Sequence, residues 1–265
     1  MVRCMSERLR GEEAGAPSGE AEADFGFRRV PRLAKSRLVR EVFDRVATRY
    51  DLMNDLMSAG IHRLWKDAMV DWLAPRPAQY LLDVAGGTGD VAFRVHTRTH
   101  GRARITVCDV NADMTRVGRD RALDRGIVAG VDWLCGDAEA LPIRSQSVDG
   151  YTIAFGLRNV TDIDRALTEA RRVLRPGGRF LCLEFSRVVV PLLDQIYERY
   201  SFAVVPWLGA LVTGSRDPYQ YLVESIRRFP PQQALAERIE RAGLGQVRVR
   251  NLSGGIAALH SAWRL

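Results

Sequence analysis

Three glycines directly follow an apolar run, an arrangement suited to binding a nucleotide. The run covers residues 80–85 and has the composition of a buried strand. Gly86, Gly87 and Gly89 come next, and glycine lets a chain turn tightly with no Cβ between the backbone and a ligand. Together with Thr88 they form a predicted cofactor-binding loop.

An acidic residue lies where a second strand is expected to end. Residues 104–110 form that strand, and Asp109 stands near its carboxyl end, twenty positions after Gly89. In dinucleotide-binding folds an acid at this place accepts hydrogen bonds from ribose hydroxyls. The loop and Asp109 therefore predict a ligand that carries a ribose, and they leave its identity open.

Two further acids bear on the identity of this ligand. The loop satisfies the relaxed dinucleotide fingerprint through Ala92, so NAD is one candidate. Asp83 precedes the glycines, where its carboxylate would repel a pyrophosphate but could hold an ammonium group or ordered water around an amino-acid tail. After the third expected strand, Asp137 could accept from an adenine amino group, and the backbone amide of Ala138 could donate to a ring nitrogen.

Each of these acids also has a simpler interpretation. Asp83 could cap the following helix, and Asp137 could be an ordinary turn residue. The order and spacing of the whole set are harder to explain as unrelated caps and turns. They favour a nucleoside with an amino-acid tail over NAD.

Alternating strands and helices position these residues. Apolar stripes predict helices within residues 36–73, and Pro75 and Pro77 then break the chain. Strands are expected near residues 80–85, 104–110, 131–135, 148–155, 178–185, 246–251 and 256–264. The first five fit a parallel sheet, whereas the short connection between the last two implies an antiparallel pair. This α/β pattern, a seven-stranded and mostly parallel sheet with an antiparallel C-terminal strand, resembles the Rossmann-like class I methyltransferases, which implies S-adenosylmethionine as the cofactor.

The chain is expected to form one catalytic domain. Residues 1–24 mix glycine and glutamate without an apolar core, which predicts a disordered segment. Residues 25–265 would form a single methyltransferase domain, with N-terminal helices at 25–77. A second helical stretch at 190–231 interrupts the strand pattern, and we expect it to be a lid over the site.

Composition and residue spacing argue against a nucleic-acid partner, a membrane-spanning helix and a metal site. The net charge of +7 comes almost wholly from arginine, since Lys35 and Lys66 are the only lysines, and the arginines are scattered between acids. We therefore expect no nucleic-acid partner. No apolar run approaches the ~20 residues of a spanning helix. The cysteines and histidines do not cluster, so no metal is expected.

Two sequence blocks resemble one family of methyltransferases. Residues 50–65 match every fixed position of the pattern Y-D-x-M-N-x-x-[aliphatic or Met]-S-x-x-x-H-x-x-W, a signature of the ubiquinone/menaquinone biosynthesis methyltransferase family. Residues 172–186 match a second family signature, with Arg175 where lysine is frequent. The resemblance extends from about residue 25 to the C-terminus and includes residues 155–162. It identifies the chain as a member of this family.

The resemblance assigns several residues to the cofactor. Family cofactor-binding positions correspond to Thr88, Asp109, Asp137 and Ala138. Ala154 stands where many members have a serine that contacts the cofactor, and loss of one hydroxyl bond would cost about 0.5–1.5 kcal/mol. Tyr50 and Asn54 could close the entry helix over the cofactor, or could stabilise the turns of that helix.

The implied reaction is C-methylation of a prenylated hydroquinone ring. It needs a base that assists hydroxyl deprotonation and removes the ring proton after methyl transfer. Arg158 follows the fourth strand and could stabilise a phenolate oxygen or orient a water, with Asn159 beside it. His62 titrates in the right range to act as the base, or it packs within its helix.

The implied acceptors are demethylmenaquinol and 2-methoxy-6-polyprenyl-1,4-benzoquinol, one or both. The alternatives are N-methylation of phosphatidylethanolamine, or a non-catalytic cofactor-binding scaffold in a quinone-synthesis complex. The apolar residues 200–212 could cover a polyprenyl tail or touch lipid, or could pack as ordinary helix. The expected location is cytoplasmic, with peripheral contact to the inner face of the membrane.

Overall fold

A computed structural model describes residues 22–46, 55, 58, 60–189 and 217–265. Tyr50 and Asn54 lie outside these residues, as do residues 1–21 of the expected disordered segment and 190–216 of the expected lid.

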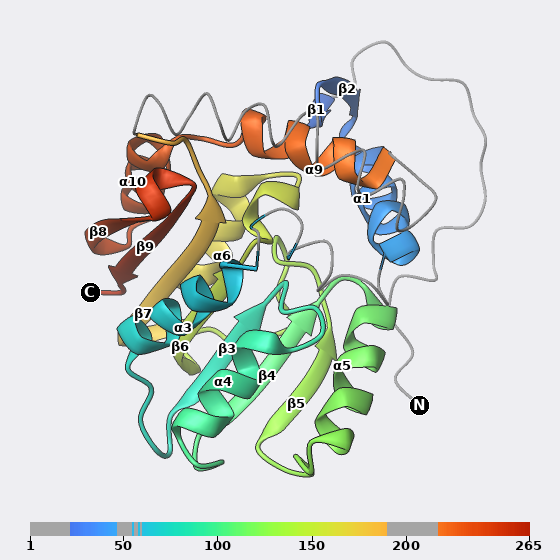
Figure 1. Cartoon of the computed structure of the whole chain (residues 1–265). Coiled ribbons are helices and arrows are strands. Elements are labelled where there is room, and N and C mark those ends of the chain that lie inside the picture. Colours follow the sequence, from blue (N-terminus) through green and yellow to red (C-terminus); the bar gives the residue numbers. More distant parts are fainter. Residues whose placement is uncertain (1–21, 47–54, 56–57, 59, 190–216) are drawn as a thin grey trace.

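A seven-stranded sheet forms the centre of the molecule (Figure 1). Its strands lie in the order β5-β4-β3-β6-β7-β9-β8. Their bounds are β3 Tyr80–Val84, β4 Arg104–Asp109, β5 Val131–Cys135, β6 Val148–Ala154, β7 Leu174–Phe185, β8 Gly245–Leu252 and β9 Ala257–Trp263. Neighbours among β3 to β7 pair in parallel, and β9 pairs antiparallel with both β7 and β8. The predicted sheet and its antiparallel C-terminal strand are confirmed.

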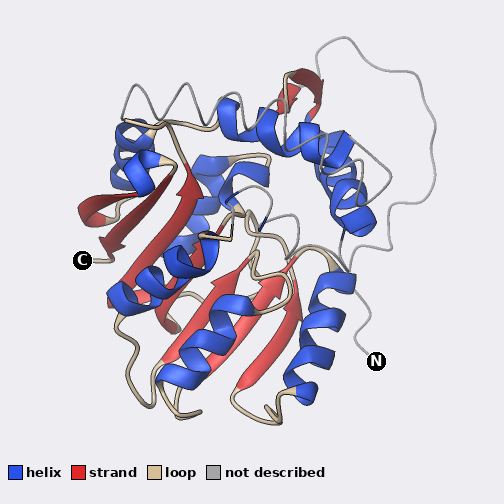
Figure 2. Cartoon of the chain, in the orientation of Figure 1, coloured by secondary structure: helices blue, strands red, loops and turns tan. Residues whose placement is uncertain are grey.

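Helices cover both faces of the sheet (Figure 2). The strands are apolar at successive positions, so they feed two cores: Leu81 belongs to one and its neighbour Leu82 to the other. The first core includes α3 (His62–Leu73) and α4 (Asp90–Arg98), and the second includes α6 (Ile163–Val173) and α10 (Gln232–Arg241). Helix α5 (Ala112–Asp124) contacts β4 and β5. Short 3-10 turns are η2 (Leu157–Asn159) and η4 (Ser253–Gly255).

A β-hairpin that the sequence pattern did not indicate precedes the helices. It consists of β1 (Glu22–Phe25) and β2 (Arg28–Pro31), so residues 22–24 of the segment expected to be disordered belong to a strand. The hairpin lies against α9 (Asp217–Arg228), where the Glu224 carboxylate accepts from the Phe27 backbone amide at 2.9 Å. Phe25 stacks on Tyr221 with ring centroids 4.3 Å apart. These distant partners explain why local sequence did not reveal the hairpin.

The predicted N-terminal helices are present as α1 (Arg32–Val46) and α3, and Trp65 and Met69 of the expected apolar stripe of α3 are buried. The expected stripe of this helix also includes Leu64, which is 67% exposed. The polar residues His62 and Lys66 are buried as well, and each has a polar partner inside the protein. No helix among the described residues is long and apolar enough to span a membrane.

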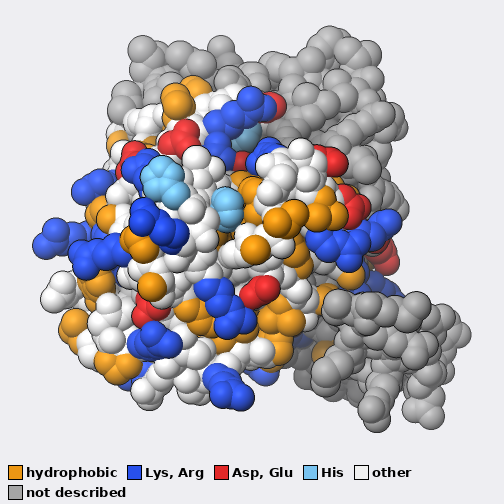
Figure 3. Space-filling view, turned by 90° about the horizontal axis from the view of Figure 1, so that it is seen from below, with side chains coloured by type: hydrophobic (Ala, Val, Ile, Leu, Met, Phe, Trp, Pro, Cys, Tyr) orange, Lys and Arg blue, Asp and Glu red, His pale blue; other side chains and the backbone are white. Residues whose placement is uncertain are grey.

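Basic side chains on the surface face that Figure 3 shows are spread among acidic and apolar groups. Many arginines are paired with acids, as in the Arg98–Asp71 and Arg104–Asp132 ion pairs.

Candidate functional site

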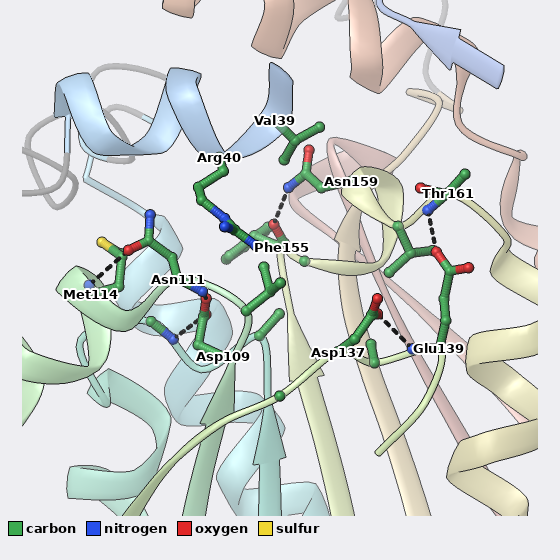
Figure 4. Close-up of a pocket in the computed structure, with 17 residues that line it drawn as sticks. Val39, Arg40, Asp109, Asn111, Met114, Asp137, Glu139, Phe155, Asn159 and Thr161 are labelled. Carbon is green, nitrogen blue, oxygen red and sulfur yellow. Dashed lines mark hydrogen bonds between the residues drawn. The ribbon is translucent and has the colours of Figure 1, made fainter. Parts of the chain in front are cut away.

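A pocket opens at the carboxyl ends of β3, β4, β5 and β6, beneath α1 (Figure 4). Open α/β sheets bind ligands at this edge. The lining residues are Val39, Arg40, Ala85, Gly87, Asp109, Val110, Asn111, Met114, Gly136, Asp137, Ala138, Glu139, Phe155, Gly156, Asn159, Val160 and Thr161.

Asp109 is the fixed acidic group of this pocket. One carboxylate oxygen accepts from the Gly87 backbone amide at 2.9 Å, and the other accepts from the Asn111 amide at 2.8 Å. Burial raises the pKa of Asp109, and these two hydrogen bonds oppose the shift. The two bonds hold the side chain rigidly. Since each carboxylate oxygen has two lone pairs, the side chain can still accept from two ligand hydroxyls.

The glycine loop lies against Asp109 and the core. Gly87, at φ +54°, is the glycine of this loop that lines the pocket. A Cβ on Gly86 would lie 2.7 Å from a carboxylate oxygen of Asp83, and one on Gly89 would lie 2.5 Å from the Trp133 ring. Gly86 and Gly89 are therefore needed for close packing, and Gly87 for access to a ligand.

Thr88 points away from the pocket. Its buried hydroxyl accepts from the guanidinium of Arg121 on α5 at 3.1 Å. The side chain lines a separate cleft between α3, α4 and α5. Thr88 is thus placed to hold the loop, and its predicted contact with the cofactor would have to come from its backbone.

Asp83 is buried at the end of β3, and it is not among the described residues that line the pocket. Thr152 Oγ1 donates to its Oδ1 at 2.7 Å, whereas Oδ2 has no hydrogen-bond partner among the described residues. Burial, opposed by the Thr152 bond and the charge of Lys66, raises the pKa of Asp83 to about 7. A buried carboxylate oxygen without a donor is ready to take a proton or a cationic ligand group.

Asp137 and Ala138 both line the pocket after β5. The Asp137 carboxylate accepts from the backbone amide of Glu139 at 2.8 Å, so the turn that we considered as an alternative does form. The turn and the predicted binding role are compatible, because the turn presents both residues to the pocket.

The backbone is strained at two neighbouring strand ends. Ala85 and Phe155 have φ values of 49° and 56°, an uncommon conformation for residues other than glycine. A Cβ on Gly156 would lie 2.4 Å from the Ala85 side chain, so the two loops touch. Such strain persists only where the surrounding structure enforces it, and it is concentrated at binding sites.

Asn159 and Arg40 bring polar side chains to the pocket. The Asn159 amide lies 3.5 Å from the Phe155 carbonyl, and its oxygen accepts from Tyr221 at 3.2 Å. Arg40 extends from α1 toward the pocket in Figure 4.

The side chain of Arg158 lies elsewhere than its predicted catalytic role requires. Its side chain is 1% exposed, and the guanidinium pairs with Glu184 at 2.8 Å and donates to the Phe155 carbonyl at 2.6 Å. Burial raises the pKa of Glu184, and Arg158 opposes the shift. Arg158 is not among the described residues that line this pocket, and it contacts the strained turn through the Phe155 carbonyl.

His62 is also separated from the pocket. It lies at the start of α3, with Nδ1 3.1 Å from the Ser58 hydroxyl, and lines the cleft that contains Thr88. Burial, together with the charge of Lys66, lowers the pKa of His62 to about 4. A histidine with this pKa is a weak base, and the helix-packing interpretation describes its position better.

Ala154 ends β6 opposite Leu183 and packs against the first core. Within the described part of the chain it does not line the pocket, so a serine there would have to reach the cofactor past the strand end.

Sequence reasoning missed several lining residues. Asn111 carried a detectable signal, because it follows Asp109 and caps α5 by accepting from the Asp113 and Met114 amides. Arg40, Glu139 and Thr161 carried no such signal, since only folding brings them to the pocket. No cluster of metal-binding side chains occurs among the described residues.

Comparison with solved structures supports the fold. A SAM-dependent methyltransferase from Thermotoga maritima matches with a TM-score of 0.61 and 20% identity, over 86% of this chain and all of that one. A phosphoethanolamine N-methyltransferase 2 from Haemonchus contortus, solved with S-adenosyl-L-methionine, matches with a TM-score of 0.59 and 14% identity, over 85% of this chain and 60% of that one. The fold, with the pocket at the carboxyl ends of the strands, is that of the class I methyltransferases.

Sequence comparison gives the family. The model of the ubiE/COQ5 methyltransferase family matches residues 32–264. A protein of Brucella abortus (strain S19) named "Ubiquinone/menaquinone biosynthesis C-methyltransferase UbiE" is 54% identical over 260 residues, 97% of each chain. A protein of the same name from Brucella anthropi is 52% identical, over 98% of this chain and all of that one. The chain belongs to the ubiE/COQ5 methyltransferase family.

Proposed function

We propose that the protein transfers a methyl group from S-adenosylmethionine to a ring carbon of a prenylated hydroquinone in menaquinone and/or ubiquinone biosynthesis. Near full-length similarity to relatives with that name supports the reaction. The observation that carries the cofactor assignment is Asp109, a buried carboxylate fixed by two backbone amides at the edge of the pocket.

The residues at the pocket fit the parts of this cofactor. Asp109 would accept from the ribose hydroxyls, and Asp137 with the Ala138 amide would bind the adenine edge. Asp83 is not one of the described lining residues, and its orphaned oxygen is the feature that supports a role toward the ammonium of the amino-acid tail. Gly87 allows close approach, and Thr88 holds the loop through Arg121. Tyr50 and Asn54 lie outside the described residues and stay predictions.

The cofactor supplies an electrophilic methyl group on a sulfonium. An electron-rich ring carbon is the matching nucleophile, and it becomes richer when the ring hydroxyl loses its proton. Attack neutralises charge, so exclusion of water and alignment of the two reactants supply most of the acceleration. The apolar side chains that line the pocket and could exclude water are those of Val39, Met114 and Phe155.

Polar contacts to the acceptor oxygen would come from Asn159 and Arg40, which line the pocket. Arg158 is better placed as a positioning residue, since it holds the Phe155 carbonyl and Glu184. We assign no general base, and His62 stays a predicted base with a position that disfavours it.

The alternative acceptor is phosphatidylethanolamine. The match to a phosphoethanolamine N-methyltransferase is 14% identical and concerns the fold alone. Relatives named as quinone C-methyltransferases are more than 50% identical over nearly the whole chain, which favours the hydroquinone. Peripheral contact with the inner membrane face and membership of a quinone-biosynthesis complex are further parts of this proposal, because the acceptor carries a polyprenyl tail.

The quinone profile of a deletion strain tests the proposal. Loss of the gene should cause accumulation of demethylmenaquinone, of the demethylated ubiquinone precursor, or of both, and re-expression should restore the methylated quinones. Asp109→Asn should restore them poorly, whereas Asp113→Asn, an exposed residue of α5, should act as wild type. An unchanged quinone profile in the deletion strain would rule the proposal out.

A further inference from the structure

Tyr221 is a buried residue of α9 that reaches the lining of the pocket through one hydrogen bond. It is 5% exposed, and its hydroxyl donates to Oδ1 of Asn159 at 3.2 Å. Asn159 lines the pocket and, within the described part of the chain, Tyr221 does not. The methyl transfer as proposed gives Tyr221 no role, although Tyr221 binds a side chain that is placed to contact the acceptor.

The N-terminal hairpin holds Tyr221 in place. Its ring stacks on Phe25 of β1, with 4.3 Å between the ring centroids and 23° between the ring planes. Further along α9, Glu224 accepts from the Phe27 backbone amide at 2.9 Å, so the hairpin is attached to the helix at two points. Burial raises the pKa of Tyr221, against the charge of Arg158. The phenol therefore stays protonated at neutral pH and can donate.

The side-chain amide of Asn159 has a defined orientation. Its oxygen accepts from Tyr221, and its nitrogen lies 3.5 Å from the carbonyl oxygen of Phe155, which Figure 4 shows. A flipped amide would place its oxygen against the Phe155 carbonyl, where two acceptors would meet without a donor. The nitrogen therefore lies on the side of Phe155, a lining residue, and the oxygen lies on the side of α9.

The amide nitrogen keeps donor capacity for a ligand. Its contact with the Phe155 carbonyl is at the long limit of a hydrogen bond, and that carbonyl already accepts from Arg158 at 2.6 Å. The second N–H has no acceptor among the residues that the structure describes. Asn159 thus offers a donor to the pocket, which suits a ligand oxygen that gains negative charge and opposes an ammonium headgroup.

We propose that Tyr221 is a positioning residue for methyl transfer, which holds the Asn159 amide with its N–H groups toward the ring oxygen of the acceptor. This rests on the proposed function, because the hydroquinone supplies that oxygen. Tyr221 does not contact the acceptor itself. The stabilisation is greatest when the ring hydroxyl has lost its proton, so the hydroxyl of Tyr221 acts on the rate of transfer more than on binding of the acceptor.

Tyr221→Phe separates this role from simple packing. The variant removes the hydroxyl and keeps the ring that stacks on Phe25. The matched control is Tyr80→Phe, which removes a hydroxyl that bonds Thr106 at 3.0 Å, between two residues outside the described pocket lining. Asn159→Ala and the double variant Tyr221→Phe/Asn159→Ala complete the set, because a positioning residue has no effect once the residue that it positions is absent.

The experiment is single-turnover transfer from tritiated S-adenosylmethionine to the quinol that the wild type methylates, with enzyme in excess so that slow variants stay measurable. Tyr221→Phe should lower the saturating rate about 3- to 10-fold, the effect of one hydrogen bond. The enzyme concentration at half-saturation and the calorimetric affinity for S-adenosylmethionine should not change. The double variant should be as slow as Asn159→Ala and no slower, and Tyr80→Phe should match the wild type.

A Tyr221→Phe rate equal to that of the wild type would overturn the proposal. So would an equal fold-loss with and without the Asn159 side chain, or a loss that appears only in the affinity for S-adenosylmethionine or in the melting temperature, since each of these results assigns Tyr221 to packing. Absence of transfer to any quinol by the wild type would instead contradict the proposed function, so the two failures are distinguishable.

Discussion

Arg158 and Glu184 form a buried ion pair that contacts Phe155, a residue of the pocket lining. Glu184 accepts from both the backbone amide and the guanidinium of Arg158, and the guanidinium also donates to the carbonyl of Phe155. Phe155 has a positive φ and lines the pocket. A pair placed in this way fixes the strained turn that carries Asn159 and thereby shapes the site without facing it.

Arg158→Met should therefore destabilise the protein strongly, because it leaves Glu184 buried without its cation. A loss of about 3–5 kcal/mol in the free energy of unfolding is expected. Arg158→Met/Glu184→Leu should recover much of it, whereas Arg119→Met, which removes an exposed ion pair, should change stability by less than about 1 kcal/mol. Urea denaturation measures all three. If Arg158→Met kept the stability of the wild type but had greatly lowered methyl transfer, the result would favour a direct catalytic role for Arg158.

The buried His62 leads to a second prediction at this scale, which concerns how the stability of the protein depends on pH. Its pKa is about 4 in the folded protein, below the ordinary value of 6.5 that it regains when the chain unfolds. Between these values the unfolded chain binds a proton that the folded chain does not, so stability falls as pH decreases from about 7 to 4. The contribution of His62 is on the order of 3 kcal/mol at the acid end. His62→Gln should weaken this pH dependence in thermal melts, and an unchanged slope would contradict the buried neutral histidine.

The glycine loop is the element on which the site depends, and it is held from two sides. Arg121 of α5 donates to Thr88, and Lys66 of α3 pairs with Asp90 at the start of α4. Gly86 lies against Asp83 and Val107 with no room for a Cβ. The loop is therefore a packed structure as well as a binding surface.

Gly86→Ala should disrupt this element. The added Cβ would lie 2.7 Å from the Asp83 carboxylate and 2.8 Å from Val107, distances that real Cβ atoms do not tolerate. We expect a lowered melting temperature and at least a tenfold weaker affinity for S-adenosylmethionine. Gly126→Ala is the control, because its φ of +71° costs about 1–2 kcal/mol but its Cβ would meet nothing within 4 Å. Equal affinity in the two variants would contradict the packing account of the loop.

The central sheet could be predicted from sequence because its strands carry continuous apolar runs and ordinary turn residues. All seven expected strands occur with nearly the expected bounds. The β1–β2 hairpin could not be predicted, since it depends on Glu224 and Tyr221 about 200 residues away. The burial of His62 and Lys66 on α3 could not be predicted, because local periodicity does not reveal their polar partners.

At the scale of the whole molecule, the site joins segments that are distant in sequence. Asp109, Asp137 and Gly87 could be located from strand ends alone, because parallel strands present their carboxyl ends at one edge. Arg40 reaches the same pocket from α1. The orientations of Arg158 and Thr88 depend on partners, Glu184 and Arg121, that only the fold brings close.

The pocket lies between the sheet and the N-terminal helix α1. We expect residues outside the strand ends to select the methyl acceptor. The fold alone is shared with methyltransferases less than 25% identical to this chain. The family membership and the fixed Asp109 together make a hydroquinone ring the predicted methyl acceptor and S-adenosylmethionine the predicted donor.

The most direct test is methyl transfer by the purified protein from tritiated S-adenosylmethionine, with demethylmenaquinol, 2-methoxy-6-polyprenyl-1,4-benzoquinol and phosphatidylethanolamine as separate acceptors. We predict a ring-methylated product with one or both quinols, none with the oxidised quinones, and none with the phospholipid. Methylation of phosphatidylethanolamine alone, or binding of the cofactor with no transfer to any quinol, would contradict the account.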